Sequence, residues 1–376
     1  MLLLSGPNIC GNEWKYVKDC LDTGWVSSVG SYVDQFEKMS AAFAGTKYAV
    51  ATSSGTTALH ICLIMTGIGA GDYVIAPNIT FIATCNSIKY TGAEPIFIDT
   101  DENSWQMDLD LLEEFLENET EQREGVCHYK ADGKRIPAIM PVHVLGNMCN
   151  MDRLLALASK HNLLVIEDST EALGSYYKDR HAGSFGLLGT FSYNGNKIIT
   201  TGGGGMIVTD DETLAKKAKH LTTQAKSDPF EYVHDEIGYN YRLVNVAAAM
   251  GVAQMELLPE FIKRKKEIIR YYKQALAGVG DIGFQQVAED VNPNWWLPTI
   301  KTSRQRELLK ILNDNKMQSR PFWVPMNQLR MFRDNIYFHK NDRSDFVYRH
   351  CLSIPCSTNI TDGQLEAVSQ TIREIF

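Results

Sequence analysis

The chain has 376 residues, a formal net charge of −8 and a hydrophobic fraction of 44%. A chain of this length can bury a large core and is long enough for two domains. Its mixed, mildly acidic charge without a basic stripe argues against a nucleic-acid-binding protein. No apolar run approaches the roughly 20 residues that cross a bilayer. The apolar start is too short for a signal peptide and no basic segment precedes it.

The eight cysteines are scattered and lack the spacing of a zinc site. In a chain of this length, such cysteines are typical of reduced thiols in a cytoplasmic protein. We therefore expect a cytoplasmic protein without a metal site, a nucleic-acid partner or a membrane segment.

Strand-like and helix-like segments alternate along the first part of the chain. The pattern predicts apolar strands at 47–52, 72–77, 95–99, 136–142, 163–167 and 205–209, and helices at 56–65, 152–161 and 211–222. Apolar strands separated by helices are typical of a parallel sheet that is covered on both faces. The sequence therefore predicts an α/β fold.

The composition changes after about residue 244. An Ala- and Met-rich segment at 244–257 leads into a charged helix that starts at 263, which indicates a long connecting helix. Beyond about residue 280 the pattern mixes short strands (296–302, 319–324) with helices (305–313, 362–376). We predict a large domain over residues 1–257, and a connecting helix with a small C-terminal α+β domain over residues 258–376.

Lys197 and Asp168 form the most informative pair in the sequence. Lys197 precedes a run of four glycines at 202–205, and Asp168 ends an apolar strand. A pyridoxal phosphate enzyme needs a lysine that forms a Schiff base with the cofactor aldehyde. It also needs an acid that keeps the pyridine nitrogen protonated. The pair therefore indicates a transaminase, although either residue alone has an ordinary structural explanation.

Two further features precede this pair in the chain. Ser53 to Thr57 form a small polar turn before a predicted helix, where free N–H groups bind phosphate well; an ordinary helix N-cap explains the same residues. Phe81 follows a Pro-Asn turn and can stack on a flat ring, or belong to the core. The order of these features, rather than any one of them, favours a cofactor site.

The order of these motifs and the residues that form them resemble those of the DegT/DnrJ/EryC1/StrS family of sugar-nucleotide aminotransferases. The resemblance covers essentially the whole chain, through segments such as Gly24-Trp-Val-Ser, Pro141-Val-His, Glu167-Asp168, Gly238-Tyr-Asn-Tyr-Arg and Leu352-Ser-Ile-Pro. It implies fold type I of the pyridoxal phosphate-dependent transferases. This is the aspartate-aminotransferase-like fold, with a mostly parallel seven-stranded sheet and a small C-terminal domain.

The resemblance also implies roles for individual residues. Thr56, the Thr57 amide and the Ser192 hydroxyl would hold the cofactor phosphate, and Phe81 would stack on the ring. Asp168 would pair with the pyridine nitrogen and Lys197 would bind the aldehyde. Asn240 would reach the phosphate of a neighbouring subunit, which implies a homodimer with shared active sites.

Two positions depart from the family pattern. The family commonly has Ala and Gln two and three residues after the aspartate, where this chain has Thr170 and Glu171. Glu171 would face the phenolic oxygen of the cofactor, which a carboxylate repels unless it is protonated or paired. The dehydrating branch of the family has His at the lysine position. The intact Lys197 therefore favours amine transfer.

Within the family, the motifs look most like the LegC-type subgroup of nonulosonic (legionaminic-type) acid pathways. That resemblance implies transfer of an amino group from L-glutamate to C4 of UDP-2-acetamido-2,6-dideoxy-4-ketohexose. A GDP- or dTDP-linked keto sugar (perosamine-type) remains an alternative. The candidate sugar-nucleotide contacts are Trp25, Ser27, His143, Arg242, Arg320 and Trp323. Each of them also has a structural explanation.

Two other functions remain open at this point. A non-catalytic regulator can keep the same fold, but such proteins lose the lysine or gain a DNA-binding segment, and neither change is present here. A different fold-type-I activity on amino acids alone is the second alternative. It survives only if keto sugars are not accepted.

Overall fold

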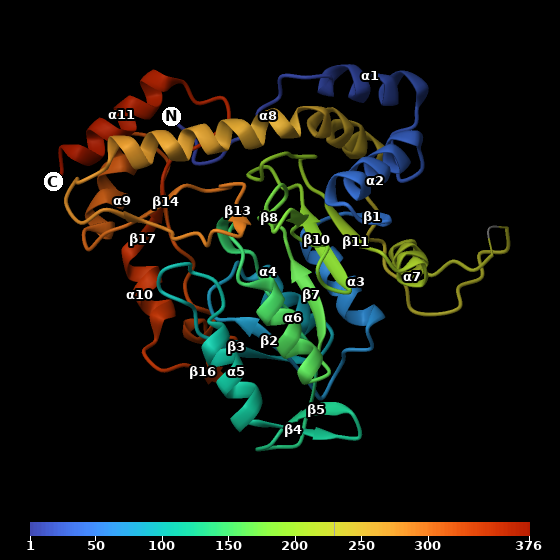
Figure 1. Cartoon of the computed structure of the whole chain (residues 1–376). Helices are drawn as coiled ribbons and strands as arrows, with labels where there is room; N and C mark the ends of the chain where they lie inside the picture. The colour runs from blue at the N-terminus through green and yellow to red at the C-terminus, as the bar shows by residue number, and fades with distance from the viewer. Residues whose placement is uncertain (229) are drawn as a thin grey trace.

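The computed structural model describes residues 1–228 and 230–376, and its centre is one large ten-stranded sheet (Figure 1). Along the main path the strands are β1 (Tyr48–Thr52), β11 (Gly205–Thr209), β10 (Leu188–Ser192), β7 (Leu164–Asp168), β6 (Arg135–Ile139), β2 (Asp72–Pro77), β3 (Glu94–Ile98) and β16 (Tyr337–Phe338). A hairpin of β4 (Thr120–Arg123) and β5 (Val126–Tyr129) extends from β6. On the main path only β11 is antiparallel to its neighbours.

The α/β fold with a mostly parallel sheet is confirmed, but the sheet is larger than predicted. Seven strands from β1 to β3 match the predicted sheet, and β16 and the β4–β5 hairpin extend it to ten. Strand β10, which leads to Lys197, is absent from the predicted series. Its sequence is only five residues long and contains Gly189, so it lacks a clear apolar pattern.

Alternating side chains on the strands divide the core into two layers. On β2, Val74 and Ala76 pack with one group of helices, whereas Ile75 faces the other group. The first face is covered by α3 (Gly55–Met65), α4 (Ala83–Tyr90) and α7 (Glu212–Thr222). The second is covered by α5 (Leu109–Asn118), α6 (Met151–Lys160), α2 (Ser31–Ala44) and α8 (Asn245–Ala275). Burial on both faces explains the continuous apolar strands.

Helix α8 is a single 31-residue helix that runs across one side of the molecule (Figure 1). Helices α1 (Glu13–Thr23) and α2 pack against it. The helix passes through the predicted domain boundary at 257/258 without interruption, so the division into 1–257 and 258–376 stays a prediction. Among the described residues, α8 included, no helix is both long and apolar enough to cross a membrane.

The C-terminal region forms a smaller α+β unit beside α8. Its sheet follows the order β12 (Gly283–Phe284), β14 (Thr299–Lys301), β17 (Cys351–Ser353) and β15 (Arg320–Pro321). Its helices are α9 (Gln305–Asp314), α10 (Arg343–His350), α11 (Asp362–Arg373) and the short η2 (Met326–Gln328). The N-terminal residues join this unit, because the Cys356 amide donates to the Leu4 carbonyl (2.7 Å).

The remaining elements lie near the carboxyl end of β7. They are the 3₁₀ helix η1 (Val144–Gly146) and a small sheet of β13 (Val291–Asn292), β8 (Tyr176–Tyr177) and β9 (Arg180–His181). The sheet joins the segment after β7 to the segment before β14. It thereby links the large sheet to the C-terminal unit close to Asp168.

Candidate active site

A cavity of about 280 Å³ lies where β7 and β10 end. In parallel α/β sheets, ligands bind at this edge, outside the carboxyl ends of the strands. The walls come from the start of α3, the segments after β7 and β10, and the C-terminal unit. The residues that line the cavity include Ser54, Gly55, Thr56, Phe81, Asp168, Glu171, Ser192, Lys197, Arg320 and Trp323.

Asp168 is the last residue of β7 and is almost fully buried. Its Oδ2 accepts a hydrogen bond from Thr84 Oγ1 (2.6 Å). Its Oδ1 accepts from Thr170 Oγ1 (2.7 Å) and from the Thr170 amide (3.2 Å). A buried carboxylate needs such donors, and here they fix the direction of the group toward the cavity. This arrangement suits an acid that pairs with a ring N–H.

Lys197 lies in the segment after β10, and its side chain reaches into the same cavity. Burial lowers the pKa of its amine, while the charges of Glu171 and Asp168 act in the opposite direction. A lysine with a lowered pKa is a better nucleophile and proton acceptor near neutral pH. The amine lies 3.8 Å from the ring centroid of Trp296.

Glu171 is buried, and the charges of Lys197 and Asp168 both act on it. Its Oε2 accepts a hydrogen bond from the Leu145 amide (2.7 Å). Burial raises the pKa of Glu171 to about 7, and Lys197 and the Leu145 amide limit the shift. A protonated carboxyl group can donate a hydrogen bond as an amide does. The raised pKa therefore lessens the expected repulsion at the position where the family commonly has Gln.

The start of α3 supplies the polar end of the cavity. Ser54 is the N-cap residue, and its Oγ accepts from the Thr57 amide (3.2 Å). Thr57 Oγ1 in turn accepts from the Ser54 amide (3.0 Å). The Thr57 amide assigned to the phosphate is thus already used in this capping box, whereas Ser54, Gly55, Thr56 and Ser192 line the cavity.

Gly55 allows α3 to approach β10 closely. A Cβ atom at Gly55 would lie 2.9 Å from the Cβ of Ser192 and 3.0 Å from Thr170 Cγ2. The helix start, the Ser192 hydroxyl and the segment after Asp168 therefore meet at one point. Helix starts bind anions through their N–H groups and dipole, so this corner of the cavity suits a phosphate group.

Phe81 and two residues of the C-terminal unit complete the walls. Phe81 is 55% exposed, which is unusual for a phenylalanine and leaves its ring free for a ligand. Arg320 and Trp323, which come from the C-terminal unit, also line the cavity. An amine, a fixed carboxylate, an open aromatic ring and an anion-binding helix start around one cavity together fit pyridoxal phosphate.

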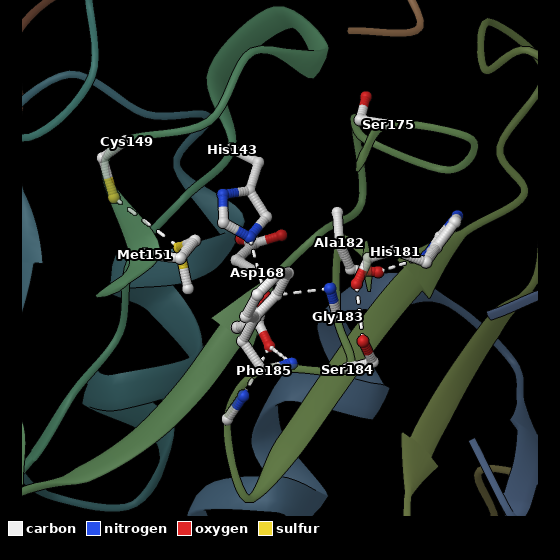
Figure 2. A network of polar contacts seen from close by, with 12 residues as sticks. His143, Cys149, Met151, Asp168, Ser175, His181, Ala182, Gly183, Ser184 and Phe185 are labelled. Carbon is white, nitrogen blue, oxygen red and sulfur yellow. Dashed lines mark hydrogen bonds and ion pairs between the residues drawn. The ribbon is translucent and has the colours of Figure 1, made fainter. Parts of the chain in front are cut away.

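His143 is fully buried and is not among the residues that line the cavity, so the structure of one chain gives no support to its assignment as a sugar-nucleotide contact. The side chain has no exposed surface, and its Nε2 lies 2.9 Å from Glu167 Oε2. Figure 2 shows the ring directed toward the end of the strand that carries Asp168. A residue at the carboxyl end of a strand faces either the ligand or the core, and the sequence does not distinguish the two.

Glu167 is the centre of this buried network. It accepts hydrogen bonds from the amides of Gly183 (2.9 Å), Phe185 (2.6 Å) and Gly186 (2.6 Å) as well as from His143. Burial raises the pKa of Glu167, but these donors outweigh it and hold the pKa below its usual value. The network joins β7 to the loop before β10, and thus holds the two strands that carry Asp168 and lead to Lys197 (Figure 2).

Four other predicted residues lie away from this cavity. Trp25 and Arg242 line a second cavity of about 680 Å³. The Ser27 carbonyl accepts from the Asn245 amide (2.6 Å), and Asn240 contacts Arg242 (3.4 Å). Within one chain they therefore do not reach Lys197, and any role in catalysis requires a second subunit.

The structure adds residues that the sequence did not reveal. Thr84 lies one helical turn after Phe81, a spacing that places both near the same end of α4. Thr170 was recognised only as a departure from the family pattern, although it donates to Asp168. Trp296 comes from a distant segment before β14 and lines the cavity beside Lys197. No local pattern in the sequence points to its contact with Lys197.

Comparison with known proteins agrees with this site. The profile of the DegT/DnrJ/EryC1/StrS aminotransferase family matches residues 7–373. The chain belongs to this family. It is a pyridoxal phosphate-dependent sugar aminotransferase, and the expected enzyme class and cofactor are thereby confirmed.

Curated relatives and a solved structure cover almost the whole length of this aminotransferase. A GDP-perosamine synthase of Escherichia coli O157:H7 is 38% identical over 98% of this chain and 97% of its own. A GDP-perosamine synthase of Vibrio cholerae is 34% identical over 100% and 99%. The crystal structure of S. venezuelae DesV, in complex with a ketimine intermediate, has a TM-score of 0.86 at 29% identity, over 97% and 94% of the two chains. The expected fold type I is confirmed.

Proposed function

We propose that this aminotransferase moves an amino group from L-glutamate to the C4 keto group of a 4-keto-6-deoxy sugar nucleotide, for bacterial surface-glycan or nonulosonic acid biosynthesis. The observation that carries the proposal is the meeting of Lys197, Asp168, Phe81 and the start of α3 around one cavity, which Arg320 and Trp323 also line. The first group fits the cofactor, and the second fits a charged, partly flat substrate.

When bound, pyridoxal phosphate supplies an aldehyde that takes up an amine and a ring that accepts electrons. Asp168, held by Thr84 and Thr170, accepts the hydrogen bond of the ring N–H. Lys197, whose pKa is lowered by burial, takes the proton from the donor's α-carbon and later returns a proton to the acceptor. Ser54, Thr56 and Ser192 hold the phosphate at the start of α3.

Arg320 and Trp323 are the proposed contacts of the sugar nucleotide within one chain. Both belong to the C-terminal unit and line the same cavity as Lys197. A guanidinium group binds phosphate oxygens through several donors in a fixed plane. An indole ring offers an apolar face with one polar edge, which suits a deoxy sugar. These two residues therefore point to the acceptor rather than to glutamate.

The nucleotide is the finer part of the proposal. The LegC-type motifs favour a UDP-linked 2-acetamido sugar of the legionaminic-type pathways. The names of the relatives from E. coli and V. cholerae favour a GDP-linked sugar as the second candidate. Both candidates share the reaction at C4, so one experiment distinguishes them.

A homodimer with shared active sites is the third part of the proposal. Trp14, Trp25, Val29 and Ile237 are large apolar residues that are exposed in one chain. Together with the second cavity, which Arg242 lines, they suit an interface. Asn240 and Arg242 of one subunit would then complete the cavity of the other. The free cysteines, most of them buried, are consistent with the expected cytoplasmic location.

The test is a half-reaction followed by absorbance. The purified protein is converted to the amine form of its cofactor with L-glutamate, freed of glutamate, and offered one 4-keto-6-deoxy sugar nucleotide at a time. Recovery of the original spectrum with the UDP-acetamido sugar supports the first candidate, and recovery only with the GDP sugar supports the second. Conversion by glutamate without recovery by any keto sugar would refute a sugar-nucleotide acceptor. Lys197→Ala is the control and should show no conversion.

A further inference from the structure

Trp296 covers the amine of the catalytic lysine. It is 3% exposed, and its indole ring centroid lies 3.8 Å from Lys197 Nζ. Within residues 1–228 and 230–376, Lys197 Nζ forms no hydrogen bond and no ion pair. The face of the indole is thus in direct contact with this amine and favours its positive charge, as do the nearby charges of Glu171 and Asp168. A Trp face is the strongest cation partner among aromatic side chains, more so in a poorly hydrated site.

The indole ring is held rigidly over Lys197. Its Nε1 donates to the carbonyl of Asn196, the residue just before the lysine (2.7 Å). The Trp296 amide donates to Asn294 Oδ1 (2.8 Å), and the Trp296 carbonyl accepts from Lys265 Nζ (2.9 Å). Because both the ring edge and the backbone are fixed, the ring cannot turn away without breaking hydrogen bonds in a buried region.

The same segment also holds the loop that carries Glu171. Asn294 Nδ2 donates to the carbonyl of Glu171 (2.8 Å) and to that of Leu173 (2.9 Å). The residues before β14 therefore fix the position of Glu171 relative to Trp296, the residue that covers Lys197. The titratable groups that face Lys197 are Glu171 and Asp168, both from the segment at the end of β7.

The neighbouring tryptophan makes a similar contact with a lysine, but away from the active-site cavity. Trp295 also faces a lysine, Lys273, at 4.5 Å. Trp295 is not among the residues that line the active-site cavity, whereas Trp296 is. The chain thus provides two adjacent tryptophans with similar contacts and different locations, which makes Trp295 a matched control.

We propose that Trp296 is a positioning residue for amine transfer, whose indole face holds the Lys197 ammonium group whenever the lysine is not bonded to the cofactor. During the reaction Lys197 must leave the cofactor, carry a proton and return. A fixed resting place beside the cavity keeps the amine in reach of the reacting carbon, and prevents it from pairing with Glu171 in an unproductive position. Such positioning is a known source of rate enhancement.

The first test measures the basicity of Lys197 in the cofactor-free protein. Reductive methylation at several pH values, with mass spectrometry of the peptide that contains Lys197, gives the pKa of this amine. We expect the pKa to fall by about half a unit in Trp296→Phe and by about one unit in Trp296→Leu, because the cation partner is weakened and then removed. Trp295→Phe should leave the pKa unchanged. This readout requires neither cofactor nor substrate.

The second test measures the rate of the glutamate half-reaction in the same variants. Trp296→Phe should slow the single-turnover rate about tenfold with little change in the half-saturating glutamate concentration. Trp296→Tyr should slow the rate no more than Trp296→Phe, and Trp296→Leu should slow it further, because tyrosine and phenylalanine both bind cations through their ring faces and leucine does not. Thermal midpoints of all variants identify any that fold poorly; Trp296→Phe, which keeps an aromatic ring at this position, carries the test if Trp296→Leu does not fold.

Two results would overturn the proposal. One is a Lys197 pKa that is unchanged or raised in Trp296→Phe and Trp296→Leu. The other is a half-reaction rate in these variants equal to that of Trp295→Phe. A lack of reaction with glutamate in every protein, wild type included, would instead refute glutamate as donor and leave the first test decisive.

Discussion

Glu171 shows how burial changes the chemistry of a single residue. In solution its carboxyl group would be ionised at neutral pH, but the cavity raises its pKa to about 7 from 4.5. The fixed N–H of Leu145 and the charge of Lys197 prevent a larger shift. Glu171 can therefore occupy a position where the family commonly has a neutral amide.

This residue gives a pH-dependent prediction. Between pH about 4.5 and 7 the folded protein holds a proton on Glu171 that the unfolded chain has released, so the free energy of unfolding falls as pH rises through this window. Glu171→Gln removes this loss and should gain stability relative to wild type, by up to about 3 kcal/mol, between pH 5 and 8. Thermal midpoints of the cofactor-free proteins at pH 5, 6, 7 and 8 measure the difference. Parallel curves for the two proteins would contradict the raised pKa.

At the scale of elements, α3 combines stability with binding. Its capping box satisfies the first N–H groups of the helix, and its start faces the cavity. Helix α11 has a capping box of the same kind, formed by Thr361 and Gln364, far from the cavity. The two helices therefore separate the structural effect of a cap from its effect on ligand binding.

We predict that Ser54→Ala and Thr361→Ala lower the free energy of unfolding by similar amounts, about 1 kcal/mol each. Only Ser54→Ala should also weaken cofactor binding, by roughly five- to tenfold, because the helix start loses its order and one hydroxyl group at the phosphate position. Urea unfolding measures the first effect and titration with pyridoxal phosphate measures the second. Equal cofactor affinity in the two variants would remove the start of α3 from the phosphate site.

At the scale of the whole molecule, Asn240 and Arg242 do not line the active-site cavity of their own chain. Arg242 instead lines the second cavity together with Trp25 and Val29, which are exposed apolar residues, and Asn240 accepts a hydrogen bond from Arg242. The described residues that follow α7, 223–228 and 230–236, extend away from the body of the chain (Figure 1). This arrangement suits a second copy that receives these residues.

Mixed dimers test this arrangement. Lys197→Ala and Asn240→Ala should each be inactive or weak alone. In a hybrid, one site carries both changes and the other carries neither, so refolding the two variants together should restore roughly a quarter of the wild-type activity. Size-exclusion chromatography verifies that dimers form. Activity of the mixture no greater than the sum of the separate variants would refute shared sites.

The sequence by itself determined the α/β class and the family, and it pointed to Lys197 and Asp168 as the proposed catalytic pair. These depend on local patterns: apolar strands with period-two side chains, a lysine before glycines, and an acid at a strand end. The sequence also located Phe81, Ser192, Arg320 and Trp323, which the structure brings to one cavity. It did not locate strand β10, whose five residues carry no strong pattern.

Only the tertiary structure decided which polar residues face the ligand and which face the core. His143 and Asp168 both follow apolar strands, yet one is buried against Glu167 and the other lines the cavity. The Thr57 amide proved to be used in a cap, and Thr84 and Thr170 proved to hold Asp168. Trp296 lies 99 residues after Lys197 and meets it only because the C-terminal unit folds back over the sheet. Such contacts depend on packing between distant segments, which local sequence patterns do not encode.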